Sequence, residues 1–476
     1  MGDTPTPPPA SQAQISLSET MEKGDRIHFI GIGGIGLSAI AKVLLEEGYR
    51  VSGSDLKLSP ITDALAKLGA TIHQGHRAEN VDGADLAIAS SAIPPDNPEV
   101  LEARRRGIPV VKRDWVLGEM TRDRYTIAVA GSHGKTTIAA MLALILAEAH
   151  LDPSFIVGGI LRNLGTNARA GRGRHFVVEA DEYDRTFLGL RPQIAVVTNI
   201  EMDHPDCYPT VEDMVEAFRE FVSSVPEGGC LVGCGDEGRV RELMGAHGGK
   251  AITYGLGEGV DWRAAEIRPN ELGGHDFVAL HDGRAVGEFG LRIPGLHNVQ
   301  NALAALAVAH RLGLDLKGVA ETLRNFQGTK RRFELKGEAG GVTVIDDYAH
   351  HPTQIRTTLR AARERYPNRT IWAVFQPHTF SRTKALLDEF AASFADADHV
   401  VVTDIYPARE FDDLGVSATD IVARMDHPDA RYIANLDDVV AYLLPRLKPG
   451  DVLLTLGAGD GYRVGEGVLA ELQSAG

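Results

Sequence analysis

Two glycine-rich segments, each between a strand-like and a helix-like stretch, constrain the fold of this chain more than any other feature. The first is IHFIGIGGIG (residues 27–36) and the second is AVAGSHGKTT (residues 128–137). A glycine turn that joins a strand to a helix directs backbone N–H groups and the positive end of the helix dipole at one point, where they bind phosphate. Two such turns predict two nucleotide-binding α/β domains.

The first segment belongs to a predicted strand–turn–helix–strand unit. RIHFIG is a short β-rich stretch, SAIAKVLLEE has apolar residues at helical spacing and ends before Gly48, and YRVSGSD predicts the next strand. Asp55 at the end of that strand lies where such folds bind a ribose hydroxyl, and His76 and Ser91 also follow short predicted strands. The spacing leaves three interpretations open: a nicotinamide dinucleotide, another nucleotide diphosphate, or glycines needed only for packing.

The second segment predicts an ATP-binding loop. It follows the strand-like RYTIAVA and precedes the long apolar helix-like TTIAAMLALILAEA. Its glycines supply a flexible backbone, Lys135 supplies a cation for the β- and γ-phosphates, and Thr136 supplies a hydroxyl for Mg²⁺. The loop is a shortened form, because Val129 stands where the longer pattern has its first glycine.

Polar groups at the ends of later strands suggest the remaining parts of an ATP site. Glu179 ends the strand-like HFVVE, and Asp203 and His204 follow IAVVTN. Because carboxyl ends of parallel strands meet at one edge of a sheet, these groups predict a metal site, although each alone is more often a surface or capping residue. Asn298 could bind adenine or simply cap a helix, and of Arg331 and Arg332 one could clamp a γ-phosphate while both could be solvated.

The last third of the chain again alternates strands and helices. GVTVIDD, TIWAVFQP, HVVVTDI and DVLLTLG are buried-type strands. The polar residues His350, His351 and His378 follow them. Three histidines could indicate zinc, but a substrate pocket accounts better for the neighbouring arginine and aromatic residues.

We therefore expect an α/β fold of three domains. They are an N-terminal Rossmann-like domain (residues 23–121), a central P-loop ATPase-like domain (122–328) and a C-terminal Rossmann-like parallel sheet (329–476), after a disordered tail rich in Pro, Ser and Thr (1–22). A stretch from residue 228 to about residue 290 is rich in turns.

Composition narrows the classes of partner. A formal net charge of −16 argues against binding nucleic acid, and no apolar stretch is long enough to cross a membrane. Three cysteines, of which Cys230 and Cys234 form a poor metal motif, are consistent with a reducing, cytoplasmic location. We expect a monomer or a homodimer.

Eight ordered motifs then resemble one family, the Mur ligases of bacterial cell-wall synthesis. They are HFIGIGGIGLSAIA, GSHGKTT, EADEYD, TNIEMDHPD, GLHNVQNALAA, RRFE, DDYAHHP and FQPHTFSRT. The resemblance is greatest to the alanine-adding branch. It implies that the first loop holds UDP-N-acetylmuramate, that the second holds ATP with two Mg²⁺ ions, and that the muramate carboxylate is phosphorylated to an acyl phosphate, which the amine of L-alanine attacks.

The same resemblance assigns residues to roles. The implied catalytic residues are Lys135, Glu179, His204, Arg332 and His350. The implied ATP-binding residues are Gly131, Ser132, His133, Gly134, Lys135, Thr136, Thr137, His297, Asn298, Arg332 and Asp347. The implied sugar-nucleotide residues are Gly31, Gly33, Gly34, Gly36, Asp55, His76 and Ser91. His350, His378 and Arg382 would bind the amino acid, and Thr136, Glu179 and His204 would bind metal.

Three departures from the family pattern bear on the choice of branch. No lysine lies between His204 and Lys250, although several sister ligases use a carbamylated lysine there. Thr379 stands where many alanine-adding members have arginine, and Tyr183 is typical of the branch that recycles a ready-made tripeptide. That branch, a nicotinamide-dependent dehydrogenase and a nucleotide-binding regulator without turnover are the alternatives.

Overall fold

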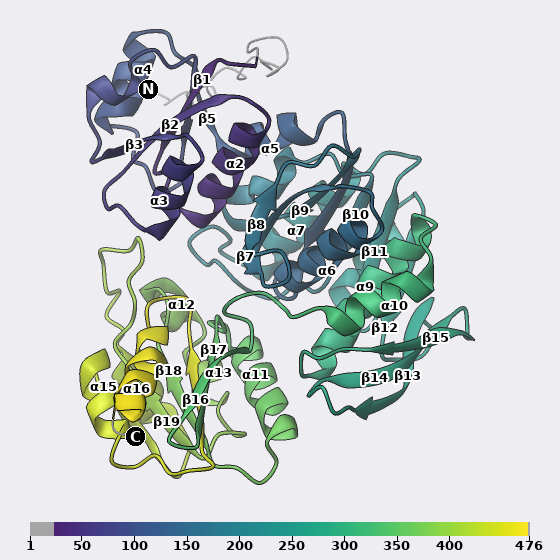
Figure 1. Ribbon diagram of the computed structural model, residues 1–476, viewed down its shortest axis with the longest axis vertical. Coiled ribbons are helices and arrows are strands. Elements are labelled where there is room, and N and C mark those ends of the chain that lie inside the picture. Colours follow the sequence, from purple (N-terminus) through teal and green to yellow (C-terminus); the bar gives the residue numbers. More distant parts are fainter. Residues whose placement is uncertain (1–22, 475–476) are drawn as a thin grey trace, which may run out of the picture. The chain divides into compact units, whose positions relative to one another are not determined.

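Three β-sheets with flanking helices make up the part of the chain that the computed structural model describes, residues 23–474 (Figure 1). The chain divides between Arg122 and Asp123 into two compact units, the second of which holds two of the sheets. These observations confirm the predicted fold class. The predicted domain boundaries remain predictions, and the predicted tail, residues 1–22, lies outside the described residues.

The N-terminal unit is built on a five-stranded parallel sheet with strand order β3-β2-β1-β4-β5. Its strands are β1 (Arg26–Ile30), β2 (Arg50–Asp55), β3 (Thr71–Gln74), β4 (Leu86–Ala89) and β5 (Val110–Lys112). Its helices are α2 (Ile35–Glu46), α3 (Pro60–Lys67), the 3₁₀ helix η1 (Ala78–Val81), α4 (Pro98–Arg105) and α5 (Arg113–Thr121). The strand order reverses direction between β1 and β4, the position where open α/β sheets bind ligands.

The second unit begins with a ten-stranded sheet in the order β15-β14-β13-β12-β11-β10-β6-β9-β7-β8. Its strands are β6 (Tyr125–Ala130), β7 (Ser154–Leu161), β8 (Thr166–Arg169), β9 (His175–Glu179), β10 (Ile194–Val197), β11 (Cys230–Cys234), β12 (Ala251–Gly255), β13 (Trp262–Pro269), β14 (His275–His281) and β15 (Arg284–Gly290). Its helices are α6 (Lys135–Glu148), the 3₁₀ helix η2 (Tyr183–Gly189), α7 (Val211–Ser223), α8 (Gly238–Ala246), α9 (Leu296–Arg311) and α10 (Leu316–Asn325). The stretch from residue 228 to residue 290 is thus half of this sheet, and our expectation of mainly turns there was wrong.

The third sheet has the order β16-β17-β21-β18-β19-β20. Its strands are β16 (Glu334–Ala339), β17 (Val342–Asp347), β18 (Ile371–Phe375), β19 (His399–Val402), β20 (Ala430–Tyr432) and β21 (Val452–Leu456). Its helices are α11 (Pro352–Arg365), α12 (Phe380–Ala385), α13 (Leu387–Ala391), α14 (Ala418–Arg424), α15 (Leu436–Leu443) and α16 (Tyr462–Ser474). The predicted parallel pairing holds except at β16, which pairs antiparallel with β17. Separate apolar cores pack on the two faces of the sheet.

Local sequence explains why several helices start and end where they do. Ser59 and Thr62 form a capping box at α3, and Thr210 and Asp213 form one at α7. Gly48, just after α2, has a φ of +96° and ends that helix as expected. Helix α6 is apolar on every side and is accordingly buried, packed against α9.

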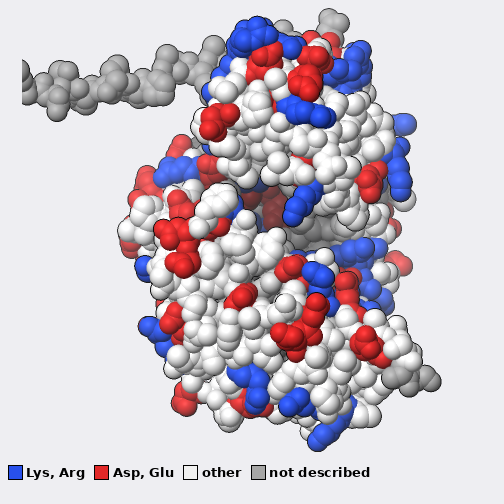
Figure 2. Space-filling view, turned by 90° about the vertical axis from the view of Figure 1, so that its left-hand side faces the viewer, with Lys and Arg blue, Asp and Glu red and all other residues white. Residues whose placement is uncertain are grey.

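On the face drawn in Figure 2, lysine and arginine side chains are interspersed with aspartate and glutamate side chains. Within residues 23–474, no helix has the length and the apolar character needed to cross a membrane.

Candidate active site

The second glycine-rich segment forms a tight loop between β6 and α6. Gly131 and Gly134 have φ angles of +130° and +84°, in the region that favours glycine. A Cβ atom at Gly131 would lie 1.9 Å from the hydroxyl oxygen of Thr198, so no larger residue fits there. Val129 stands where the longer pattern has its first glycine. It is a buried residue of β6 and pairs with Glu179 of β9. The loop therefore begins after this position.

Lys135, the first residue of α6, lies against its own loop and a buried carboxylate. Its Nζ donates to the carbonyl oxygen of Gly131 at 2.5 Å and to Glu182 Oε1 at 2.8 Å. Burial alone would lower the pKa of Lys135, but the negative charges of Glu182, Asp181 and Glu179 outweigh it and raise that pKa. Lys135 is therefore a fixed cation at the N-terminus of α6.

Thr136 and Glu179 lie together in an arrangement that suits Mg²⁺. Thr136 Oγ1 donates to Glu179 Oε1 at 2.9 Å, and Glu179 Oε2 accepts from the Gly158 N–H at 2.6 Å. Adjacent ligands of an octahedral Mg²⁺ lie about 2.9 Å apart, because each bond to the metal is about 2.1 Å long. Burial raises the pKa of Glu179, and a bound cation would favour its ionised form. The two oxygens can therefore be adjacent ligands of one ion.

A cavity of about 320 Å³ opens beside this loop. Its walls come from the loop, the start of α9 and the segment between residues 328 and 358. The predicted ATP-binding residues that line it are His133, Gly134, Thr136, Thr137, His297, Asn298, Arg332 and Asp347. The others, Gly131, Ser132 and Lys135, are not among the lining residues. The cavity is the size of a small-molecule pocket.

The structure separates the two adjacent arginines. Arg331 Nε donates to Asp346 Oδ2 at 3.0 Å and its Nη2 donates to the Gly457 carbonyl oxygen at 2.7 Å, so Arg331 braces the third sheet. Arg332 instead lines the cavity, with its guanidinium 5.2 Å from the ring centre of Tyr348. Arg332 is therefore the arginine that can reach a ligand in the cavity.

Asn298 does not cap α9, because the N-cap residue is Gly295. The Asn298 side chain donates from Nδ2 to the Pro294 carbonyl oxygen at 2.6 Å, and its oxygen accepts from Asn301 at 3.1 Å. Burial lowers the pKa of the neighbouring His297 to about 4, so that ring is neutral at physiological pH. A neutral ring and an ordered amide at the cavity wall suit an aromatic base.

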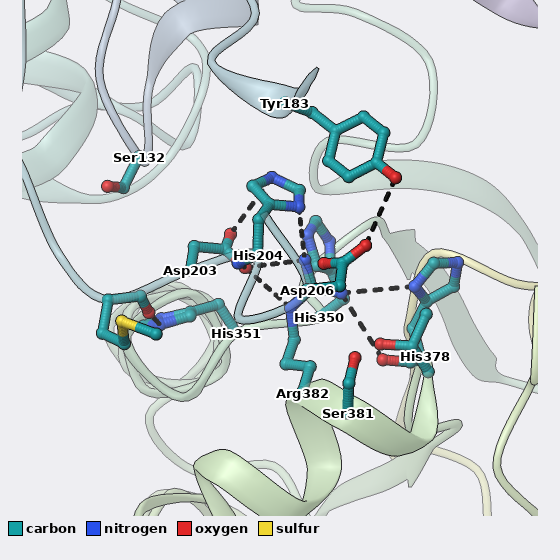
Figure 3. Close-up of polar contacts among 12 residues, drawn as sticks. Ser132, Tyr183, Asp203, His204, Asp206, His350, His351, His378, Ser381 and Arg382 are labelled. Carbon is teal, nitrogen blue, oxygen red and sulfur yellow. Dashed lines mark hydrogen bonds and ion pairs between the residues drawn. The ribbon is translucent and has the colours of Figure 1, made fainter. Parts of the chain in front are cut away.

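A buried ion pair joins the segment after β10 to α12 (Figure 3). Arg382 Nε and Nη2 both donate to Asp203 Oδ1, at 2.8 and 2.7 Å. Burial would raise the pKa of Asp203, but the charge of Arg382 outweighs it and holds that pKa well below its usual value. Arg382, which we expected to bind an amino-acid carboxylate, thus already has a carboxylate partner, and its Nη1 faces His378 Nδ1 at 3.3 Å.

His350 and His378 add two neutral imidazoles to the group of side chains around Asp203 and Arg382. His350 Nδ1 lies 2.8 Å from the carbonyl oxygen of Tyr348, which can only accept, so Nδ1 carries the proton and Nε2 carries a lone pair. Burial, with the charge of Arg382, holds the pKa of His350 well below its usual value, and burial lowers that of His378 to about 3. His350 can therefore accept a proton at Nε2.

His204 and Arg409 also belong to the group of side chains around Asp203 and Arg382. His204, one of the predicted metal residues, has its Nε2 3.8 Å from Oε1 of Glu182, the carboxylate that also binds Lys135. Arg409, from the segment after β19, donates to Asp206 Oδ2 at 2.5 Å and lies 4.2 Å from the ring centre of Tyr183. Arg409 thus brings a second guanidinium to the site.

Many alanine-adding members have arginine at the position of Thr379. In this structure Thr379 lies at the start of a helix. It is the buried N-cap residue of α12, with a φ of +67°. Its N–H donates to the carbonyl oxygen of Tyr406 at 2.9 Å. Thr379 therefore fixes the start of α12, next to the segment that carries Arg409.

In the N-terminal unit, the first glycine-rich segment turns at the carboxyl end of β1. Gly33 N–H donates to Asp55 Oδ2 at 2.9 Å, and a Cβ atom at Gly33 would lie 2.8 Å from the same oxygen. Asp55 thus braces the turn instead of projecting freely. His76 follows β3 and Ser91 follows β4, so the strand order brings the predicted sugar-nucleotide residues to one edge of the sheet.

A fully buried carboxylate, Glu99 of α4, supports this edge. It accepts from Ser54 Oγ at 2.6 Å, from Asn80 Nδ2 and from the Arg77 N–H at 3.2 Å, and it lies 3.4 Å from His76 Nδ1. Burial would raise the pKa of Glu99, but its interactions with His28, Ser54 and Asn80 lower it to about 2. Glu99 therefore remains ionised and holds His76 in position.

Glu99→Gln is expected to lower the free energy of unfolding at pH 7 by about 3 kcal/mol, because each unit of pKa shift corresponds to about 1.4 kcal/mol. The folded pKa is depressed, so this stabilisation is complete above the unfolded pKa of about 4.5 and is lost as the pH falls towards 2. Urea unfolding of both proteins at several pH values measures the difference. The exposed Glu79→Gln is the control, and a difference of equal size at pH 3 and pH 7 would contradict the assignment.

Comparison with known families matches three consecutive segments of the chain. Residues 26–125 match the Mur ligase family catalytic domain, residues 129–309 match the Mur ligase middle domain, and residues 331–459 match the Mur ligase glutamate ligase domain. The chain belongs to the Mur ligase family. The matched segments follow the three sheets in order.

Individual relatives are similar to this Mur ligase over nearly its whole length. A UDP-N-acetylmuramate–L-alanine ligase of Geobacter sp. (strain M21) is 48% identical over 95% of this chain and 99% of its own. The crystal structure of a UDP-N-acetylmuramate–alanine ligase from Thermotoga maritima superimposes with a TM-score of 0.81 at 30% identity, over 95% of this chain and 100% of the other. A murein peptide ligase from Psychrobacter arcticus gives a TM-score of 0.72 at 26% identity, over 94% and 99%.

Sequence reasoning missed several residues of this Mur ligase that the structure places beside predicted ones. Glu182 lies in the EADEYD motif, in which we had assigned only Glu179, so its motif was a usable signal. Asp203 was considered only as a metal ligand, although it is the partner of Arg382. Glu99 and Arg409 carry no local signal, because their roles depend on contacts between distant segments.

Proposed function

We propose that this Mur ligase joins L-alanine to the carboxylate of UDP-N-acetylmuramate, using ATP, in peptidoglycan precursor synthesis. The observation that carries the proposal is the 48% identity, over 95% of the chain, to a protein named for that reaction. The geometry supports it, because a phosphate-binding loop and a pocket with cationic and neutral nitrogen groups lie in the same unit.

In the first step, an oxygen of the muramate carboxylate attacks the γ-phosphorus of ATP, the bond to ADP breaks, and an acyl phosphate forms. Lys135 and Arg332 would offset the negative charge of the transferred group. Bound Mg²⁺ would supply further charge stabilisation, and Thr136, Glu179 and His204 are the residues that would hold two such ions. The carboxylate thereby gains a leaving group.

In the second step, the amine of L-alanine attacks the acyl carbon, the bond to phosphate breaks and an amide forms. The amine must lose protons, and His350 has a lone pair on Nε2 that can accept one. Arg382, His378 and Arg409 would orient the amino acid. The first glycine loop, with Asp55, His76 and Ser91, would hold the UDP part of the other substrate.

The three cysteines are all free, which supports a reducing, cytoplasmic location. We retain a monomer or homodimer as the expected assembly.

Phosphate release and mass spectrometry of the nucleotide product test the proposal. Purified protein is incubated with ATP, Mg²⁺ and UDP-N-acetylmuramate, with L-alanine and the tripeptide L-alanyl-γ-D-glutamyl-meso-diaminopimelate in separate reactions. We expect a product heavier by one alanine residue, together with ADP and phosphate, and no product without ATP. Turnover with the tripeptide alone would assign the chain to the murein peptide ligases instead, and inactivity with both would overturn the proposed substrates.

A further inference from the structure

A chain of hydrogen bonds runs from the segment before α11 to the phosphate-binding loop. The His350 N–H donates to Gln354 Oε1 at 3.0 Å, and Gln354 Nε2 lies 2.9 Å from His133 Nδ1. His133 Nε2 in turn lies 3.2 Å from Glu201 Oε2, which also accepts from Thr353 Oγ1 at 2.7 Å. The chain links a residue of the amino-acid pocket to a residue that lines the ATP cavity.

The backbone N–H of His350 fixes which group donates and which group accepts in each hydrogen bond of this chain. A backbone N–H can only donate, so the Gln354 atom that faces His350 is the amide oxygen, and the amide NH₂ faces His133. His133 Nδ1 must then accept, and the proton of the neutral ring lies on Nε2, from which it is donated to Glu201. Gln354 thus selects one of the two tautomers of His133.

The same polarity argues against a metal ion at this place. His133, Glu201 and His351 bring two imidazoles and a carboxylate within 4.8 Å of one another, which is the composition of a metal site. A proton on His133 Nε2 leaves no lone pair for a metal there. His351 is also committed, since its Nε2 donates to the Met202 carbonyl oxygen at 3.1 Å and its Nδ1 accepts from the Thr353 N–H at 3.3 Å.

His133 also helps to shape the loop through its backbone. Its N–H donates to Asn199 Oδ1 at 2.8 Å, and its carbonyl oxygen accepts from Thr198 Oγ1 at 2.6 Å. The side chain adds further attachments for this loop residue, and one of them, the bond to Gln354, comes from α11. Burial would raise the pKa of Glu201, but its hydrogen bonds lower it to about 2, so the acceptor at the end of the chain is charged.

We propose that Gln354 is a positioning residue that couples the amino-acid site to the ATP site by fixing the tautomer of His133. When α11 lies as in this structure, Gln354 and Glu201 hold the His133 ring from both sides and keep the loop ready for phosphate. The coupling rests on the proposed function, because it assigns the two linked sites to ATP and to the amino acid. The tautomer itself does not depend on either substrate.

The Gln354→Glu variant tests the proposal with almost no change in size. Glutamate still accepts from the His350 N–H but offers His133 an acceptor instead of a donor, so His133 Nδ1 must become protonated. Protein labelled with ¹⁵N-histidine shows this directly in a long-range ¹H–¹⁵N spectrum, with the His133 signals assigned from a His133→Gln sample. We expect an unprotonated Nδ1 in the native protein and a protonated one in Gln354→Glu.

The kinetic consequence is an increase of about tenfold in KM for both ATP and L-alanine in Gln354→Glu and Gln354→Ala, the size expected for losing a hydrogen bond in a charged network. Gln300→Glu is the matched control: Gln300 lines the same cavity but donates to Asp236, so its replacement should leave the His133 nitrogen signals unchanged. A protonated Nδ1 in the native protein, or an altered tautomer with unchanged KM values, would overturn the proposal. Failure of the proposed function would instead appear as inactivity of the native protein.

Discussion

Lys135→Ala is expected to lower kcat roughly a thousandfold, the size found when a preorganised group that stabilises a charged transition state is removed. Lys135 is a cation at the start of α6 with 12% of its side chain exposed, and its Nζ lies 2.8 Å from the buried Glu182. Phosphate release in the presence of all three substrates measures the loss. Lys317→Ala, at an exposed position of α10, is the control and should retain the native rate.

The same substitution leaves the buried Glu182 without its cation, which costs about 3–5 kcal/mol when one partner of a buried pair is removed. The double variant Lys135→Ala/Glu182→Gln separates the two effects. It should recover most of the lost thermal stability, because no uncompensated charge remains, yet stay inactive. Recovery of turnover together with stability would show that Lys135 acts on folding and not on phosphate.

Arg382→Ala is expected to lower kcat/KM for L-alanine about a hundredfold while changing KM for ATP less than about threefold. Arg382 holds Asp203 with two hydrogen bonds and faces His378, so its removal disrupts the amino-acid side of the site and leaves the ATP cavity intact. Steady-state kinetics with each substrate varied in turn measure both constants. Arg360→Ala, which removes an exposed pair in α11, should change neither.

A second variant tests whether the effect of Arg382→Ala comes from the unpaired charge of Asp203. Arg382→Ala leaves the ionised Asp203 buried, so a second variant, Arg382→Ala/Asp203→Asn, should regain stability in thermal unfolding without regaining affinity for alanine. Equal increases in both KM values for Arg382→Ala, reversed by the second substitution, would indicate a folding defect and would contradict a role in binding the amino acid.

Local patterns predicted the elements that depend on local physics. Gly131 and Gly134 lie at backbone angles that favour glycine, and apolar runs such as β10 are fully buried. The capping box of Thr210 and Asp213 at the start of α7 is also a local feature. The strands from β11 to β15 were missed, because several are short or rich in charged and glycine residues, so no clear period was visible.

Sequence alone determined the family, the two glycine loops and eight of the residues that line the cavity, because each depends on a short motif with its own backbone or chemical requirement. Only the tertiary structure decided how the charged groups are paired. Asp203 and Arg382 lie 179 residues apart, and Glu99 reaches His76 because α4 packs against η1, the short helix that follows His76. A buried charged group pairs with whichever group the fold brings within hydrogen-bonding distance. The sequence around either group does not reveal which distant segment that will be.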